Sequence, residues 1–288
     1  MKVLVTGAAG MVGRAVSEFC ERSGDTVFAY DRRALDIADT EEVRHAVRST
    51  RPDAVINCAA WTDVDGCESD VGRAFAANAR GPGNLAAASR EVNAAFVTIS
   101  TDYVFDGTKE GFYTQADEPN PISVYGRAKL EGEQRSQEAN GASIVVRTGF
   151  IFGRGGKNFL SIVIDRIRRN EQIKAITDAY GTPTYARDLA GRLRELAQLN
   201  HPGVFHVVNS GNGASYAEFA EEAMRCVDVG DRQVEHVLSA SLSRLAPRPQ
   251  NSRLCCLYSE KLGLNPLPDW RESLQKFAAE TGFAQKSF

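Results

Sequence analysis

The chain has 288 residues, of which 43% are hydrophobic and 25% are charged, and its formal net charge at pH 7 is -3. This length and composition are typical of a globular protein with a sizeable core, built as one large domain or two unequal ones. The balanced charge lacks the basic excess of proteins that bind nucleic acid or anionic membranes, so we expect neither as a partner.

The N-terminus carries Lys2 and a short apolar run that stops at Gly7. This run is too short for the hydrophobic region of a signal peptide, and no stretch of about 18 apolar residues follows that could span a membrane. The six cysteines form no C-x-x-C pair and have no histidine cluster beside them. This pattern favours reduced thiols over disulfides or a metal site, so we expect a cytoplasmic protein that binds no metal.

The first half of the chain alternates short apolar runs, typical of buried strands, with stretches of helical periodicity. Strands are predicted at residues 3–5, 27–30, 54–57, 95–100 and 143–147. Helices are predicted at residues 11–22, 40–49, 71–79, 83–91 and 124–138. Strands separated by helices indicate parallel β-α-β units, so the predicted fold class is α/β with a doubly wound parallel sheet, a Rossmann fold.

The second half of the chain is less regular, and its loops contain more proline. Helices are predicted at residues 158–169, 186–199, 216–226 and 269–280, with a strand at 204–208. We interpret residues 1–150 as an NAD(P)-binding Rossmann domain. We interpret residues 151–288 mainly as a smaller substrate-binding region, with some segments returning to the Rossmann core.

A glycine-rich segment lies between the first predicted strand and the first predicted helix. Its spacing is G-x-x-G-x-x-G, one residue longer in its first step than the G-x-G-x-x-G fingerprint. Glycines allow a tight turn and a close approach of the backbone to a pyrophosphate, and the following helix N-terminus supplies N–H donors. No Gly-Lys-Ser/Thr follows, which argues against a P-loop. The residues predicted to hold the dinucleotide here are Gly7, Gly10, Met11, Val12 and Gly13.

The second predicted strand ends at Asp31, about 20 residues beyond the glycines, where a carboxylate binds the adenosine ribose of NADH. Arg32 and Arg33 follow at once, and an arginine there accommodates the 2′-phosphate of NADPH. The choice between NADPH and NADH therefore stays open. Further cofactor contacts are expected from Asp36 and Ile37 beside the adenine, and from the small residues that end the third strand, Cys58, Ala59 and Ala60.

Tyr125 and Lys129 are four residues apart, so on a helix they lie on one face, one turn from each other. An ammonium beside a phenol favours the phenolate, so we expect Lys129 to lower the pKa of Tyr125 and make it a better proton donor and acceptor. Thr101 follows the strand at 95–100, at a carboxyl end where doubly wound sheets bind ligands. We predict that Thr101, Tyr125 and Lys129 are the catalytic residues.

Six segments in this order resemble the dTDP-4-dehydrorhamnose reductase family, a branch of the extended short-chain dehydrogenases/reductases. They are residues 6–13, 57–65, 100–107, 124–129, 181–184 and 248–254. The resemblance implies reduction of the C4 ketone of dTDP-4-dehydro-L-rhamnose to dTDP-L-rhamnose, with NADPH or NADH as the cofactor. The implied cofactor contacts are Gly10, Met11, Val12, Asp31, Asp36, Ile37, Ala60 and Thr62, with Tyr125 and Lys129 also reaching the cofactor. The implied substrate contacts are Thr101, Asp102, Tyr103, Tyr125 and Phe150.

The chain departs from the family pattern at Phe150, where the run Arg-Thr-Gly-Phe replaces Arg-Thr-Ser-Trp. Phenylalanine keeps an aromatic wall but lacks the indole N–H, which leaves the sugar specificity open; the alternative is that Phe150 packs in the core. Tyr103 stands where related dehydratases carry a glutamate, which favours reduction over dehydration.

Two other functions remain compatible with the sequence. One is a reductase of another nucleotide-linked 4-keto-6-deoxy sugar. The other is a non-catalytic, NADP-binding regulatory subunit that resembles the β-subunit of methionine adenosyltransferase. Whether the chain forms a homodimer is also left open.

Overall fold

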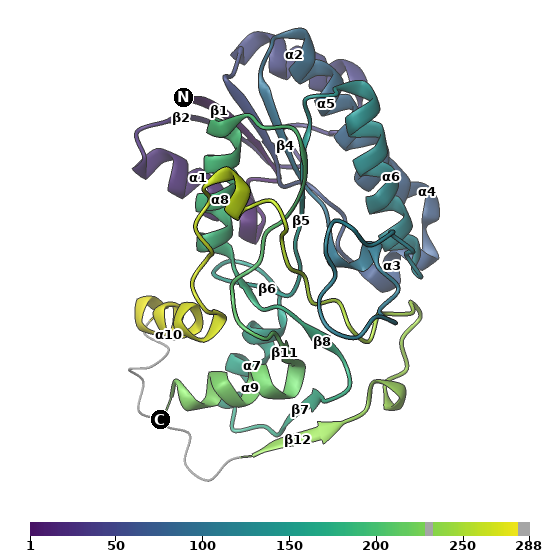
Figure 1. Ribbon diagram of the computed structural model, residues 1–288, viewed down its shortest axis with the longest axis vertical. Helices are drawn as coiled ribbons and strands as arrows, with labels where there is room; N and C mark the ends of the chain where they lie inside the picture. Colours follow the sequence, from purple (N-terminus) through teal and green to yellow (C-terminus); the bar gives the residue numbers. More distant parts are fainter. Residues whose placement is uncertain (228–232, 282–288) are drawn as a thin grey trace.

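The computed structural model describes residues 1–227 and 233–281, and within these ranges its centre is a six-stranded parallel sheet (Figure 1). The strand order is β2-β1-β3-β4-β5-β10. The strands are β1 (Lys2–Thr6), β2 (Thr26–Tyr30), β3 (Ala54–Asn57), β4 (Ala95–Ile99), β5 (Ile144–Arg147) and β10 (Gly203–His206). The order changes direction between β1 and β3, and sheets of this kind bind ligands beyond the carboxyl ends of the strands at that point.

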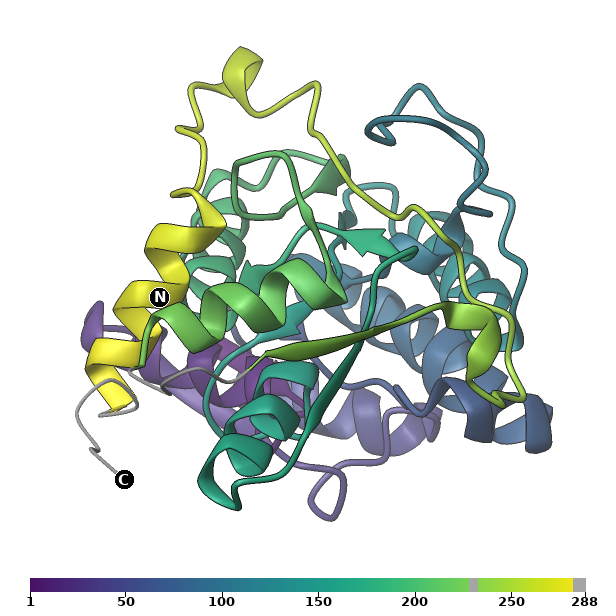
Figure 2. The same ribbon diagram turned by 90° about the horizontal axis from the view of Figure 1, so that it is seen from below.

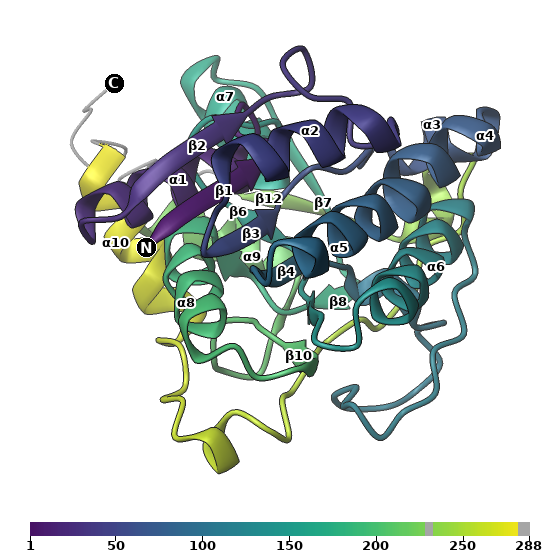
Figure 3. The same ribbon diagram turned by 90° about the horizontal axis from the view of Figure 1, so that it is seen from above.

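Helices cover both faces of this sheet (Figure 3). On one face, α1 (Met11–Arg22) packs against α8 (Ala186–Leu199). On the other face, α5 (Gly81–Glu91) packs between α2 (Thr40–Thr50) and α6 (Val124–Ala139). The predicted α/β class with a doubly wound parallel sheet is therefore confirmed.

The alternation of side chains along β1 shows how the sequence builds two cores. Val3 and Val5 are fully buried against the α1 and α8 side, whereas Leu4 between them is fully buried against the α2 and α5 side. Successive side chains of a strand point to opposite faces, so a strand covered on both sides reads as a continuous apolar run. This is why the first strand could be recognised from three residues.

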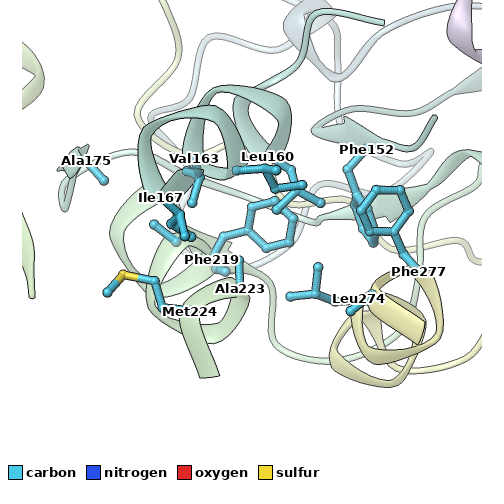
Figure 4. Close-up of a cluster of buried hydrophobic side chains, with 14 of the residues drawn as sticks. Phe152, Leu160, Val163, Ile167, Ala175, Phe219, Ala223, Met224, Leu274 and Phe277 are labelled. Atoms are coloured by element: carbon cyan, nitrogen blue, oxygen red, sulfur yellow. The ribbon is translucent and has the colours of Figure 1, made fainter. Parts of the chain in front are cut away.

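A smaller lobe lies at the carboxyl ends of the strands, below the sheet in Figure 1 and in front in Figure 2. Its helices are α7 (Phe159–Arg168), α9 (Tyr216–Arg225) and α10 (Trp270–Thr281). Two strands, β7 (Ile173–Ile176) and β12 (Val234–Val237), form a parallel pair within it. Apolar side chains from all three helices form its own core, in which Phe219 lies between Leu160, Leu274 and Phe277 (Figure 4).

Two segments of the second half of the chain join the sheet rather than this lobe. Strand β10 pairs with β5 at the sheet edge, and α8 packs on α1.

Residues 246–257, which we call the strap, then return across the sheet's carboxyl edge. The backbone N–H of Ala246 donates to Asp65, that of Ser252 to Tyr180 O, and Leu254 forms a bridge with Tyr113.

The structure differs from the sequence-based expectations in three places. The helix expected at residues 71–79 is instead a short α4 (Val71–Phe75) followed by a π-helical turn (Ala76–Arg80), within which the Asn78 side chain bonds to the backbone of Trp61. Helix α3 (Val64–Ser69) was not predicted, since six residues give no periodicity. The short strands of the second half were not predicted for the same reason; they are β6 (Ile151–Phe152), β7, β8 (Tyr180–Gly181), β9 (Thr184–Tyr185), β11 (Ala214–Ser215) and β12.

Among the described residues, no helix combines the length and the apolar character needed to cross a membrane.

Candidate active site

A cavity of about 560 Å³ opens at the carboxyl ends of β1, β3 and β4, between the sheet and the smaller lobe. Its walls come from the turn before α1, the end of β4, the start of α6, the loop after β5, and the strap. This is the position at which the strand order reverses, so the topology and the cavity point to the same site.

The glycine turn forms one end of this cavity and needs its glycines. Gly7 has a φ of +65°, and a Cβ there would lie 2.6 Å from the backbone N of Ala59. A Cβ on Gly13 would lie 2.2 Å from Gly7 O. Within the described ranges no side chain caps the start of α1, and its first turn carries no acid. Free N–H groups at a positive helix end suit a pyrophosphate, so the residues present fit a dinucleotide cofactor.

The predicted cofactor residues fall into two groups. The cavity is lined by Gly10, Met11, Val12, Gly13, Cys58, Ala59, Ala60 and Thr62. Outside its lining lie Gly7, Asp31, Arg32, Asp36 and Ile37. Ile37 is buried beneath Gly81 in the core, so its side chain packs rather than faces a ligand.

The carboxylate of Asp31 forms hydrogen bonds within its own loop. One oxygen of its carboxylate accepts from the backbone N–H of Arg33 at 2.8 Å and from that of Ala34 at 3.0 Å. Asp36 likewise accepts from the N–H of Ala38. The side chain of Arg32 is exposed beside this turn. A carboxylate and a guanidinium therefore both lie near the position expected for the adenosine ribose of a dinucleotide. The choice between NADPH and NADH stays open.

The three predicted catalytic residues meet at the centre of the cavity. Thr101 follows β4, and Tyr125 and Lys129 lie one turn apart on α6. Helix α6 begins just before Tyr125 because the Ser123 side chain accepts from the N–H of Gly126 at 3.1 Å. A hydrogen bond joins the side chains of Thr101 and Tyr125. The local sequence therefore places both hydroxyls on one side of the cavity.

The expectation that Lys129 lowers the pKa of Tyr125 is wrong for this structure. The ammonium of Lys129 donates to Ile99 O at 2.6 Å, and burial lowers its pKa to about 8. Burial also raises the pKa of Tyr125, which the hydrogen bond with Thr101 offsets only in part. Tyr125 is therefore a neutral phenol with a proton to give, which is the form that a reduction needs.

A buried ion pair between Glu133 and Arg147 supports the part of α6 that carries Tyr125 and Lys129. Glu133, one turn after Lys129, accepts from Arg147 Nη2 at 2.7 Å and from its Nε at 3.0 Å. The hydroxyl of Ser100 also donates to Glu133. The pair links α6, β4 and β5, and the Glu133 charge raises the pKa of Lys129 against the effect of burial.

Asp102 is buried in the floor of the cavity, with 4% of its surface exposed. Its Oδ1 accepts from the hydroxyl of Thr101 at 3.0 Å, and its Oδ2 accepts from that of Ser252 at 2.5 Å. Burial raises its pKa to about 6. Gly149 is required beside it, because a Cβ there would lie 2.2 Å from the Asp102 carboxyl carbon.

Two aromatic residues predicted to face the sugar also line the cavity. Tyr103 lies edge-on to Tyr125, with ring centroids 6.1 Å apart. Phe150 has a φ of +48° and packs on Tyr216 and Phe219 at 4.4 and 5.0 Å. Phe150 therefore packs against the core of the smaller lobe and also lines the cavity, while its contact with a sugar stays a prediction.

Three basic residues of the cavity were not predicted: Lys157, Arg244 and Arg248. Asp65 fixes Arg248, accepting from its Nη2 at 2.8 Å and its Nη1 at 3.1 Å. Arg248 is the first residue of one of the six segments that resemble the family, and Lys157 is the last residue of the run Gly-Arg-Gly-Gly-Lys. The sequence therefore contained a pattern from which both residues could have been predicted. Arg244 carried none. Over residues 1–227 and 233–281, no group of three or more His, Cys, Asp or Glu side chains is placed to hold a metal ion.

Comparisons with known proteins agree with this geometry. The family model described as "RmlD substrate binding domain" matches residues 1–283. A dTDP-4-dehydrorhamnose reductase of Mycolicibacterium smegmatis is 38% identical over 281 residues, which cover 96% of this chain and 85% of that protein. A protein of Streptomyces antibioticus, named a probable dTDP-4,6-dihydroxy-2-methyloxan-3-one 4-ketoreductase, is 37% identical over 280 residues, covering 96% of this chain and 94% of that protein.

Among solved structures, a dTDP-4-dehydrorhamnose reductase of Bacillus anthracis in complex with NADP superposes with a TM-score of 0.93. It is 33% identical, and the match covers 97% of this chain and 99% of that chain.

Proposed function

The chain belongs to the RmlD substrate binding domain family, and from this premise we propose that it is an NAD(P)H-dependent reductase of a nucleotide-linked 4-keto-6-deoxy sugar. The substrate that fits best is dTDP-4-dehydro-L-rhamnose, reduced at C4 to dTDP-L-rhamnose. The observation that carries this proposal is the single cavity in which the glycine turn, Thr101, Tyr125 and Lys129 meet.

Each of these residues has a separate task in the proposed reaction. A nicotinamide held in this cavity would supply the hydride for the carbonyl carbon. Tyr125 gives its phenolic proton to the carbonyl oxygen, which its neutral state allows. Thr101 would orient that oxygen, and Lys129 would hold the ribose of the nicotinamide half.

The basic side chains of the cavity suit the diphosphate of a nucleotide sugar. Arg248 and Arg244 contribute two guanidinium groups to its lining, and Lys157 adds an ammonium. Guanidinium groups bind phosphates through paired N–H donors, and Asp65 already fixes the orientation of Arg248. In this proposal residues 1–150, together with 186–206, hold the cofactor and supply the catalytic residues, and the remaining segments mainly hold the sugar nucleotide.

Two observations keep other substrates in view. Phe150 gives the sugar pocket a smaller aromatic wall than tryptophan would, and the Streptomyces antibioticus relative is named for a different keto sugar. A regulatory subunit is less well supported, because such a role needs none of the buried contacts that place Thr101, Tyr125 and Lys129. All six cysteine thiols, which lie within the described ranges, are free, and this supports a reducing compartment such as the cytoplasm.

The test is cofactor oxidation by the purified protein, followed through the nicotinamide absorbance, with dTDP-4-dehydro-L-rhamnose and with other dTDP-4-keto-6-deoxy sugars. The proposal expects the highest kcat/KM with dTDP-4-dehydro-L-rhamnose. Preference for another keto sugar would correct the substrate alone. No turnover with any of them, together with tight cofactor binding and a stable complex with a synthetase, would favour the regulatory subunit.

A further inference from the structure

The hydroxyl of Thr101 has one proton, and an ionised Asp102 is the neighbour that accepts it. It is donated to Asp102 Oδ1 at 3.0 Å. The backbone N–H of Tyr103 donates to the same hydroxyl oxygen at 3.2 Å. A hydroxyl has one donor and two acceptor positions, and the Tyr125 hydroxyl, which also hydrogen-bonds with Thr101, takes the second acceptor position. In this arrangement Thr101 has no proton left to donate to a ketone oxygen, which is an acceptor.

Protonation of Asp102 reverses this arrangement. A protonated Oδ1 would donate to Thr101, so that Asp102 and the Tyr103 N–H together fill both lone pairs of the threonine oxygen. The Thr101 proton is then the only part of the hydroxyl left to face the cavity. Building on the proposed function, we propose that Asp102 is a positioning residue whose neutral form turns the Thr101 proton toward the carbonyl oxygen of the substrate.

Ser252 decides which oxygen of Asp102 carries the proton. Its hydroxyl donates to Oδ2 at 2.5 Å, while its other acceptor, Tyr180 O, is 3.4 Å away. Oδ2 is therefore already an acceptor, and the proton is left to Oδ1, the oxygen next to Thr101. Ser252 lies 150 residues from Asp102 in the chain, so the strap completes a hydrogen-bond chain that begins at the catalytic threonine.

The surroundings of Asp102 make the neutral form accessible. The titratable groups that face it are three phenols: Tyr103 on its own segment, Tyr125 on α6 and Tyr216 on α9. Burial raises the pKa of all three, so they stay neutral while Asp102 titrates. The positive charges of Arg244 and Arg248 also act on Tyr216 and lower its pKa, and burial raises the pKa of Asp102 to about 6.

The test is the pH dependence of kcat/KM for dTDP-4-dehydro-L-rhamnose with NADPH, because this ratio reports groups of the free enzyme. The wild type should lose activity by about tenfold per pH unit as Asp102 ionises above its pKa. In Asp102→Asn, the amide N–H₂ can donate to Thr101 while its oxygen accepts from Ser252. This variant should stay active and lack that decline, leaving only a fall at higher pH from Lys129, whose pKa is about 8.

Two further variants separate positioning from folding. Ser252→Ala removes a donor that favours the ionised carboxylate, so the decline should move to higher pH. Asp117→Asn changes a half-buried carboxylate that pairs with Lys109 outside the cavity lining and should leave the profile as in the wild type. A decline that persists in Asp102→Asn, or that does not move in Ser252→Ala, would overturn the proposal. So would an Asp102→Asn protein that folds and binds NADPH but is inactive at every pH.

A second readout does not depend on turnover. Infrared difference spectra between acidic and alkaline solutions should contain a carboxylic acid band. Asp102→Asn should remove this band, and Ser252→Ala should raise the pH at which the band disappears. If the wild type reduces no keto sugar, the proposed function fails, and the band still reports whether Asp102 titrates. If turnover is robust but the band is missing in the wild type, the inference about Asp102 fails alone.

Discussion

Replacing Glu133 by glutamine is expected to destabilise the fold strongly, because it leaves the guanidinium of Arg147 buried without a countercharge. Glu133 is 3% exposed and Arg147 is 6% exposed. The carboxylate accepts from Arg147 Nη2 at 2.7 Å and from its Nε at 3.0 Å, bonds that a neutral amide cannot reproduce in full. Removing one partner of a buried pair costs about 3–5 kcal/mol, since the remaining charge loses its compensation.

The size of this effect can be measured by urea and thermal unfolding. A loss of about 3–5 kcal/mol corresponds to a melting temperature lower by roughly 6–20 °C for a chain of this size. Glu131→Gln is the matched control on the same helix. Its partner Arg135 is 2.7 Å away, but Arg135 is exposed and Glu131 is only half-buried, so the change should cost about 0.5 kcal/mol at most.

The double variant Glu133→Gln/Arg147→Met tests the physical reason. If the cost of each single change is mainly the charge left behind, the double variant should be less destabilised than the sum of the two single variants. A Glu133→Gln protein within about 1 kcal/mol of the wild type would refute the argument, because it would mean that Arg147 is not held by this charge. Strictly additive costs would refute it as well.

Three other variants test the site. Tyr125→Phe should lose most turnover and keep its affinity for NADPH in a fluorescence titration, because only the proton donor is removed. Near-normal turnover would exclude Tyr125 as that donor. The control Tyr258→Phe, on the surface, should behave as the wild type. Gly13→Ala should weaken NADPH binding at least tenfold, since its Cβ would lie 2.2 Å from Gly7 O and displace the turn, and unchanged affinity would separate this turn from the cofactor. Arg248→Ala should raise KM for the sugar nucleotide about tenfold with little change in kcat, a loss of about 1.4 kcal/mol of binding, whereas an unchanged KM would place the diphosphate elsewhere.

The parts of the site that could be predicted from the sequence are those set by short-range spacing. The glycine turn follows a strand of buried residues and opens a helix, so its position depends on eight consecutive residues. Tyr125 and Lys129 share a face of α6 because they are four residues apart. Thr101 could be placed because parallel strands end at one edge of a sheet.

The parts that could not be predicted depend on contacts between distant segments. Ser252 reaches Asp102 across 150 residues, and Arg248 meets Asp65 only because the strap crosses the sheet. The direction of the pKa shift of Tyr125 was also predicted wrongly. Sequence spacing places Lys129 beside the phenol, but it does not show that the ammonium bonds to Ile99 O or how deeply both groups are buried.

The most direct test of the central claim is the transfer of deuterium from NADPH labelled at the reactive carbon of its nicotinamide to dTDP-4-dehydro-L-rhamnose. The protein and labelled cofactor would be incubated with the keto sugar, and the product examined by mass spectrometry and NMR. We predict dTDP-L-rhamnose that carries deuterium at C4. A labelled cofactor that stays unconsumed, or a product without deuterium at C4, would contradict the assignment of this cavity as the active site of a C4 ketone reductase.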